Sequence, residues 1–286
     1  MTTYRSTILP QLQRLLIWIL ILFVWEAAYR AIGWKPWIFP APSHVLDALL
    51  NMLNVHTAFG DELHRGWPWL QGITAKPQAV YDSPLITASI ISAIRLCIGF
   101  VLSIILGGAI GLAMWRFAAV NNFLGPLLLG LQTLPSVCWV PLGVLIFGIN
   151  EKGVMFVLLM GSFSAIAISL RDGLQTMPPL YRRAGLMLGA KGWKLYRYVL
   201  LPASLPAFAS SLRQGFSFAW RSLLGAELIL AVEHRGLGFL LQTGRDFSDV
   251  AQVIAVMIVM VIFGMLADRW VFAKLQQAVN ARFGLG

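Results

Sequence analysis

Long hydrophobic runs alternate with shorter polar segments along the whole chain. A helix needs roughly 20 mainly apolar residues to cross the hydrocarbon core of a bilayer. Six runs come close to or exceed this length, and the second is long enough to tilt or to begin outside the bilayer. The pattern therefore predicts an all-α membrane protein with six transmembrane helices. The predicted spans cover residues 15–32, 84–115, 123–147, 153–170, 206–232 and 250–271.

The composition supports a membrane protein. The 286 residues are 58% hydrophobic and only 12% charged, whereas soluble domains carry about 25% charged residues. The net charge is +10, but no basic run is interleaved with the exposed aromatic residues that a nucleic-acid groove needs. We therefore expect the lipid bilayer as a partner, and no nucleic acid.

Basic residues predict the orientation. Six of the 22 fall between Arg171 and Arg197, in a polar loop, residues 171–206, between the fourth and fifth spans. Because basic loops favour the cytoplasmic side, both termini are predicted to be cytoplasmic. The expected segments are a cytoplasmic N-terminus, the first span, a periplasmic segment, a core domain with the other five spans, and a cytoplasmic tail. They cover residues 1–14, 15–32, 33–83, 84–276 and 277–286.

The sequence offers little for catalysis. It contains no G-x-x-x-x-G-K-[ST], H-E-x-x-H, G-x-S-x-G or C-x-x-C motif, and no histidine lies in a predicted span. In the periplasmic segment, His56 and His64 lie near two acidic residues, but their spacing matches no metal-ligand pattern. We expect no metal and no cofactor in this chain. A membrane-embedded enzyme would need a polar cluster at membrane depth, and a secondary transporter would need repeated halves and a charge relay; neither is evident.

Charged residues inside the predicted spans are the clearest polar candidates. Each costs roughly 2.5–3.5 kcal/mol in lipid, so each should face protein or a water-filled path. Arg221 either pairs with a carboxylate or a backbone carbonyl elsewhere in the bundle, or contacts an anionic solute. Glu227 lies six residues further along and therefore not on the same helix face. Asp268 and Arg269 are expected to anchor the last span and to pair with loop charges.

The third predicted span contains two prolines, Pro135 and Pro141. Each removes a backbone hydrogen bond and is expected to bend the helix. Bent helices at membrane depth are tolerated where they line a cavity, so Gln132, Ser136 and Trp139 are candidates for a translocation pathway. The alternative is a kinked packing helix with Trp139 in its core.

The polar loop carries an amphipathic pattern bounded by prolines. Pro178 or Pro179 is expected to start a short helix. Gly189 is expected to allow a tight turn, and Pro202 to stop a second short helix. A loop this long, with its own helix pattern, is expected to contact another protein.

This loop resembles the signature of permease subunits of binding-protein-dependent ABC importers, E-A-A, three residues, G, nine residues, I-x-L-P. Arg183-Ala184-Gly185 occupies the first slot, Gly189 follows, and Val199-Leu200-Leu201-Pro202 occupies the last. Arg183, Gly185 and Val199 depart from the family pattern, which affects the polar contact normally made by the acidic residue. By resemblance, ATPase coupling is assigned to Arg183, Ala184, Gly185, Gly189, Val199, Leu201 and Pro202.

Other segments resemble the nitrate/sulfonate/taurine branch of this family. Arg95 and Gly99 match its second span, TLPSVCWVPL its third, and Ala226-Glu227 with Gly236-Leu237-Gly238 its A-E … G-x-G ending. The resemblance covers residues 15–280 except for an insertion at 55–83. The candidate pathway residues are Gln132, Pro135, Ser136, Trp139, Pro141, Arg221 and Glu227.

The resemblance implies a transport subunit of the bacterial inner membrane. Two copies of the chain would form the pore, two separate P-loop ATPase subunits would supply ATP and Mg²⁺ chemistry, and a periplasmic binding protein would deliver the solute. The loop would form a cytoplasmic coupling helix between spans four and five. The implied solute is small and anionic, with nitrate, taurine and alkanesulfonates all left open.

Overall fold

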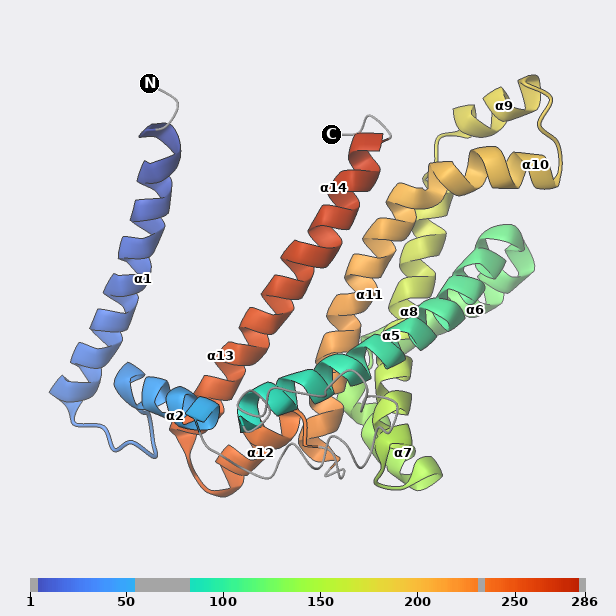
Figure 1. Cartoon of the computed structure of the whole chain (residues 1–286). Coiled ribbons are helices and arrows are strands. Elements are labelled where there is room, and N and C mark those ends of the chain that lie inside the picture. Colours follow the sequence, from blue (N-terminus) through green and yellow to red (C-terminus); the bar gives the residue numbers. More distant parts are fainter. Residues whose placement is uncertain (1–4, 55–82, 231–234, 283–286) are drawn as a thin grey trace. The chain divides into compact units, whose positions relative to one another are not determined.

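The computed structural model describes residues 5–54, 83–230 and 235–282, and these residues contain helices and no strand (Figure 1). The insertion assigned to residues 55–83, with His56 and His64, lies outside them except for Ser83. The chain forms two units. One combines Met1–Ala88 with Phe239–Val259, and the other combines Ser89–Gly238 with Met260–Gly286.

The first unit contains α1 (Arg5–Ile32), α2 (Pro42–Asn54), most of α12 (Leu237–Asp246) and the start of α13 (Val250–Ala267). Glu26 on α1 forms an ion pair with Arg30 at 2.8 Å and accepts a hydrogen bond from the Ser43 hydroxyl at 3.3 Å. This bond ties α1 to the first turn of α2. The Gln252 side-chain amide of α13 donates to the Leu240 carbonyl of α12 at 2.9 Å.

The second unit holds the rest of the chain, and α8 packs along α11 at its centre (Figure 1). Gly107 and Gly111 of α5 lie against the α8 backbone, because a Cβ on either would overlap or crowd the carbonyls of Phe163 and Ala167. Small residues of this kind let membrane helices approach closely. The helices of this unit are α5 (Pro84–Arg116), α6 (Ala118–Thr133), α7 (Val140–Phe147), α8 (Glu151–Gln175), α9 (Pro179–Met187), α10 (Trp193–Leu195), α11 (Leu201–Ile229) and α14 (Ala273–Arg282).

Some of the described helices are long and apolar enough to cross a membrane. By length and composition, three helical stretches qualify as spans, namely α5, α8 and the continuous run Val250–Ala281. The bent pair Ala118–Thr133 and Ser136–Phe147 adds a fourth if it counts as one span. The α13 face carries large exposed apolar side chains such as Met257, Ile258 and Val261, as a lipid-facing helix does.

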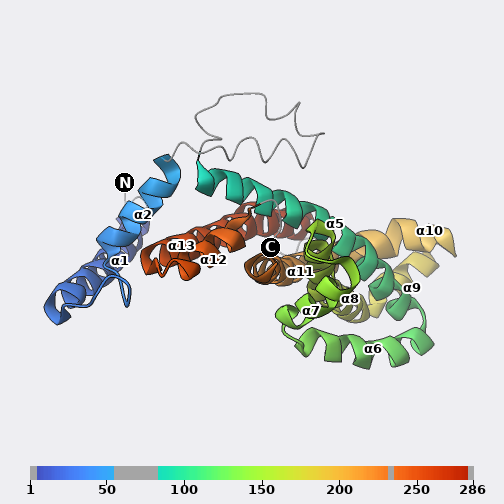
Figure 2. The same ribbon diagram turned by 90° about the horizontal axis from the view of Figure 1, so that it is seen from below.

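The third predicted span is not one continuous helix. It breaks after Thr133 and resumes at Ser136, with a bend of 103°. Leu134 before the break is extended (φ −69°, ψ 127°), the conformation that a following proline imposes. Pro141, by contrast, lies in the first turn of α7, where a missing N–H removes no helical bond. The prediction that Pro141 bends the helix was therefore wrong. Figure 2 shows α6 and α7 leaving the break in different directions.

Candidate functional site

A pocket of about 290 Å³ opens at the break between α6 and α7. The break brings extended backbone and a short 3₁₀ turn, Ser136–Trp139, beside the middle of α8 and α11. Non-helical backbone at membrane depth is tolerated where it lines a cavity. The lining residues are Gln132, Thr133, Leu134, Pro135, Ser136, Val137, Gly161, Phe218, Arg221 and Ser222.

Glycine allows three elements to meet at this pocket. A Cβ on Gly161 of α8 would overlap the Ser222 side chain of α11 and would lie 3.2 Å from the Ser136 Cβ. A Cβ on Gly225 would lie 3.2 Å from Val137 Cγ2. The broken segment therefore packs directly against α8 and α11. The small residues at these contacts determine the size of the pocket.

Arg221 is the charged member among the described residues that line the pocket. Its Nε donates to the Ser217 carbonyl at 3.0 Å, and its guanidinium packs over the Phe218 ring at 4.7 Å. This bond lies within α11 and is not the partner elsewhere in the bundle that the first alternative for Arg221 names. It uses one of five N–H donors, and the side chain is still exposed. The pocket is electropositive and offers hydrogen-bond donors for an anion.

The structure brings together four of the seven candidate pathway residues, Gln132, Pro135, Ser136 and Arg221. Trp139 and Pro141 are not among the lining residues. Trp139 packs edge-to-face on Phe156, with ring centroids 6.4 Å apart, which matches the alternative of a packing role for this residue.

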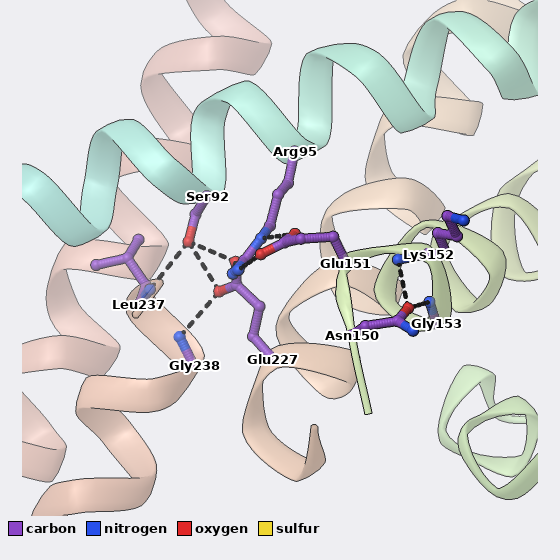
Figure 3. A network of polar contacts seen from close by, with 9 residues as sticks. All are labelled: Ser92, Arg95, Asn150, Glu151, Lys152, Gly153, Glu227, Leu237 and Gly238. Carbon is purple, nitrogen blue, oxygen red and sulfur yellow. Dashed lines mark hydrogen bonds and ion pairs between the residues drawn. The ribbon is translucent and has the colours of Figure 1, made fainter. Parts of the chain in front are cut away.

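Glu227 lies elsewhere, in a buried ion network centred on Arg95 (Figure 3). The Arg95 side chain is 1% exposed. Its Nη1 donates to Glu227 at 2.8 Å, and its Nε and Nη2 donate to the two oxygens of Glu151 at 2.8 and 2.5 Å. The network joins α5, α8 and α11, so Glu227 in this conformation holds the helices together and does not face the pocket.

Backbone and hydroxyl donors complete the coordination of Glu227. The Ser92 hydroxyl lies 2.8 and 2.9 Å from its two oxygens and accepts the Leu237 backbone N–H at 2.9 Å. The Gly238 N–H donates to Glu227 at 3.1 Å. One arginine is thus shared by two carboxylates, and the added donors stabilise the second negative charge. Figure 3 shows these contacts converging from α5, α11 and the start of α12.

Sequence reasoning missed this network. Arg95 and Glu227 are opposite charges in two different predicted spans. Because charges in lipid need partners, their pairing could have been predicted. Ser92 and Glu151 carry no comparable signal, because a serine in a span is common and Glu151 begins α8 at a loop.

The glycines after α11 are shaped by the same network. A Cβ on Gly238 would lie 2.5 Å from Glu227 Cβ and 2.8 Å from the Leu228 backbone nitrogen. Moving backbone atoms out of the way costs free energy, so we expect Gly238→Ala to lower the free energy of unfolding by about 1–3 kcal/mol. Thermal denaturation of the purified chain measures this. Gly108→Ala is the control, because a Cβ there meets nothing within 4 Å; equal stability of the two variants would contradict the packing described.

A second ion pair joins α11 to the last span. Arg213 Nε and Nη2 donate to the two Asp268 oxygens, both at 2.7 Å. The side chains are 44% and 36% exposed, so this pair is more exposed than the Arg95 network. The expectation that Asp268 pairs with loop charges was wrong, because its partner lies on the fifth predicted span.

The polar loop forms a helical hairpin at one end of α8 and α11, opposite α7 (Figure 1). Its first helix, α9, begins at Pro179 as predicted. Gly185 packs under the second helical segment, since a Cβ there would lie 2.7 Å from Leu195 Cδ1 and 3.0 Å from Val199 Cγ2. Gly189 follows α9 with φ +79°, a left-handed conformation that favours glycine. Arg183 and Ala184 are exposed on α9.

The second half of the hairpin continues into the membrane helix. Trp193–Leu195 and the π-helical turn Tyr196–Leu200 lead directly into α11 at Leu201. Pro202 lies in the first turn of α11, where proline is compatible with a helix. The prediction that Pro202 stops the second helix was wrong, and the helix that contains the fifth predicted span begins at Leu201.

Comparison with known families shows which class of membrane protein this chain belongs to. Residues 99–278 match the family described as "Binding-protein-dependent transport system inner membrane component". This chain belongs to that family. The permease is therefore an ABC importer transport subunit and not an enzyme, a multi-pass protein of the inner membrane. The alternatives of a membrane-embedded enzyme and a secondary transporter are set aside.

Relatives place the permease within the family. A Methanocaldococcus jannaschii protein, provisionally named an ABC transporter permease, is 34% identical over 65% of this chain and 69% of its own length. The taurine transport system permease protein TauC of Escherichia coli is 27% identical over 87% of this chain and 82% of its own. The bicarbonate transport system permease protein CmpB of Synechococcus elongatus is 27% identical over 66% and 68%. The nitrate/sulfonate/taurine assignment of the permease is thereby confirmed.

Solved structures support the fold. A chain of the MetNI methionine ABC transporter in an inward facing conformation aligns with a TM-score of 0.58, covering 68% of the permease and 95% of that chain. Sequence identity is 18%, so the likeness concerns the fold alone.

Proposed function

We propose that this permease forms the translocation pathway for a small anionic solute in an ATP-driven importer. The observation that carries the proposal is Arg221, which lines the pocket at the broken span. The names of the relatives support the solute class, since taurine, bicarbonate and nitrate each carry an anionic group. An anion in the pocket would meet the N–H donors of a guanidinium, and hydrogen bonds between charged groups are stronger than those between neutral groups.

We propose six spans with both termini in the cytoplasm. The helices α1 and α11 supply the two spans that length and composition do not identify among the described residues. The basic hairpin then lies on the cytoplasmic side, as basic loops do. Its place at the end of α8 and α11 opposite α7 agrees with this orientation (Figure 1).

The hairpin is proposed as the coupling segment. The proposed ATPase-coupling residues are Arg183, Ala184, Gly185, Gly189, Val199, Leu201 and Pro202. Gly185 lets α9 pack closely on the second segment, and that segment is continuous with α11. A displacement of the hairpin would therefore be transmitted to α11, which carries both Arg221 and Glu227. ATP and Mg²⁺ would bind to the partner ATPase subunits.

The assembly is proposed to contain two permease copies, two P-loop ATPase subunits and a periplasmic binding protein. ATP binding drives transport if it favours one pore conformation over the other, because a ligand shifts an equilibrium only by its differential affinity. The Arg95 network holds α5, α8 and α11 together while α9 and α11 respond to the ATPase.

Arg221 gives the test of the solute class. In proteoliposomes holding the permease, its ATPase and its binding protein, we expect Arg221→Gln to slow ATP-driven uptake of the solute at least about tenfold, because a hydrogen bond to a charged group contributes roughly 1.5–3 kcal/mol. Arg221→Lys is the matched control and should retain most uptake, since it keeps the charge. Uptake by the glutamine variant equal to wild type would contradict the role of Arg221.

A further inference from the structure

A second, larger pocket of about 660 Å³ lies at the adjoining ends of α5, α8 and α9. It shares no residue with the pocket at the broken span. Arg116, Gln175 and Arg182 provide its polar wall, and Trp115, Leu174 and Leu200 are among its apolar residues. Of the described residues that line it, none is acidic, so the pocket carries two positive charges.

The two arginines lack a compensating carboxylate among the residues that the structure describes. Within the described part of the chain, no acidic group forms a salt bridge with Arg116 or Arg182. The Arg116 guanidinium packs over the Phe117 ring at 5.2 Å. Asp172, an acidic residue near the end of α8, is engaged by Arg171 at 2.6 Å. Paired guanidiniums without an acidic partner suit a phosphate, which accepts bidentate hydrogen bonds.

The start of α9 adds to the positive potential. Pro178 and Pro179 line the pocket and form the N-cap and first residue of α9. The N-cap makes no side-chain capping bond, and the first turn carries no acidic residue. Pro178 and Pro179 have no N–H group, and the Tyr181 N–H donates to the Pro178 carbonyl at 3.2 Å. This helix end therefore acts through its dipole, which is equivalent to roughly half a positive charge. The arginines and this helix end converge on one pocket.

The surroundings of the pocket indicate a lipid. It lies at the C-terminal ends of α5 and α8, which both qualify as membrane spans, so it sits at the membrane surface. Trp115 suits this level, where tryptophan is enriched. Next to the two arginines, Phe117 is 54% exposed and Leu180 is 71% exposed. Such apolar neighbours would contact acyl chains and would serve no purpose for a small soluble anion.

We propose that this pocket binds the phosphate of an anionic phospholipid headgroup through Arg116, Arg182 and the N-terminus of α9. Basic pockets between membrane helices bind such headgroups in this way. The lipid would connect α9 to the ends of α5 and α8 and so hold the hairpin against the membrane. This site goes beyond the proposed transport function and does not depend on the solute.

Native mass spectrometry of the full-length permease in detergent tests the site, with phosphatidylglycerol and phosphatidylcholine as probes. We expect phosphatidylglycerol to bind more tightly. Arg116→Gln and Arg182→Gln should each weaken it about fivefold, and the double variant about 25-fold, from roughly 1 kcal/mol for each basic residue. Lys191→Gln is the matched control, because Lys191 is exposed in the same loop and does not line the pocket. Its affinity should equal that of wild type.

Two outcomes would overturn the proposal. If Lys191→Gln weakens binding as much as the pocket variants do, the attraction comes from the general basic charge of the loop. If inorganic phosphate at the same concentration displaces phosphatidylglycerol, the pocket is a site for a free anion and not for a lipid. The single variants keep the test valid if the double variant does not fold, because each leaves one arginine in place.

Discussion

Replacing Arg95 with methionine is expected to lower the free energy of unfolding by about 3–5 kcal/mol, the usual effect of removing one partner from a buried ion pair. Glu227 would remain 1% exposed with its charge unpaired, and Glu151 would lose its bidentate donor. Three helices would lose their common polar contact. The measurement is thermal denaturation of the detergent-solubilised chain, in which size-exclusion chromatography gives the fraction of folded protein left after heating to each temperature.

Arg213→Met is the matched control. It removes an arginine with equally good bidentate geometry and the same change in charge, but from a pair that is 44% and 36% exposed. Exposed pairs contribute about 0–1 kcal/mol, so this variant should be nearly as stable as wild type. If the two variants lose the same stability, burial of the Arg95 network does not have the energetic role assigned to it.

Substituting arginine for Gly189 is expected to weaken ATPase binding about 30-fold or more, the effect of losing a residue that contributes 2 kcal/mol or more at an interface. A Cβ at Gly189 meets nothing within 4 Å, so the permease itself has room for a side chain. Apart from backbone strain at this position, any large loss of affinity must therefore come from a surface that packs against the hairpin. Titration of the purified permease with its ATPase measures the affinity.

Gly189→Asn separates docking from backbone strain. Gly189 has φ +79°, and asparagine adopts this left-handed conformation more readily than other non-glycine residues do. The asparagine variant is expected to fold and to bind the ATPase better than the arginine variant. If the Gly189→Arg variant bound the ATPase with unchanged affinity, the hairpin would not be part of the interface with the ATPase.

The local features of the hairpin could be predicted from the sequence because they follow from single residues. Pro179 at the start of α9 and the turn at Gly189 depend on backbone rules that act over a few positions. The break after Thr133 likewise follows from Pro135. The same rule failed at Pro141 and Pro202, because proline breaks a helix only in its interior, and sequence alone did not show that both lie in a first turn.

The ion network and the pocket depend on which helices pack together, which no local pattern specifies. Arg95 and Glu227 are 132 positions apart, and the pocket needs Gly161 to admit Ser222 and Ser136. Arg221 and Glu227 were grouped as pathway residues because both are charged within one span. Their separation into an exposed pocket and a buried network follows from their six-residue spacing and from the neighbours of α11.

Purification of the tagged permease from its native membrane, with quantitative mass spectrometry of the proteins that accompany it, shows whether a separate ATPase binds this chain. We expect one P-loop ATPase subunit per permease chain, retained in detergent that keeps a known ABC importer intact. Recovery of the permease without an ATPase under those conditions would contradict the assignment of the hairpin as the coupling segment.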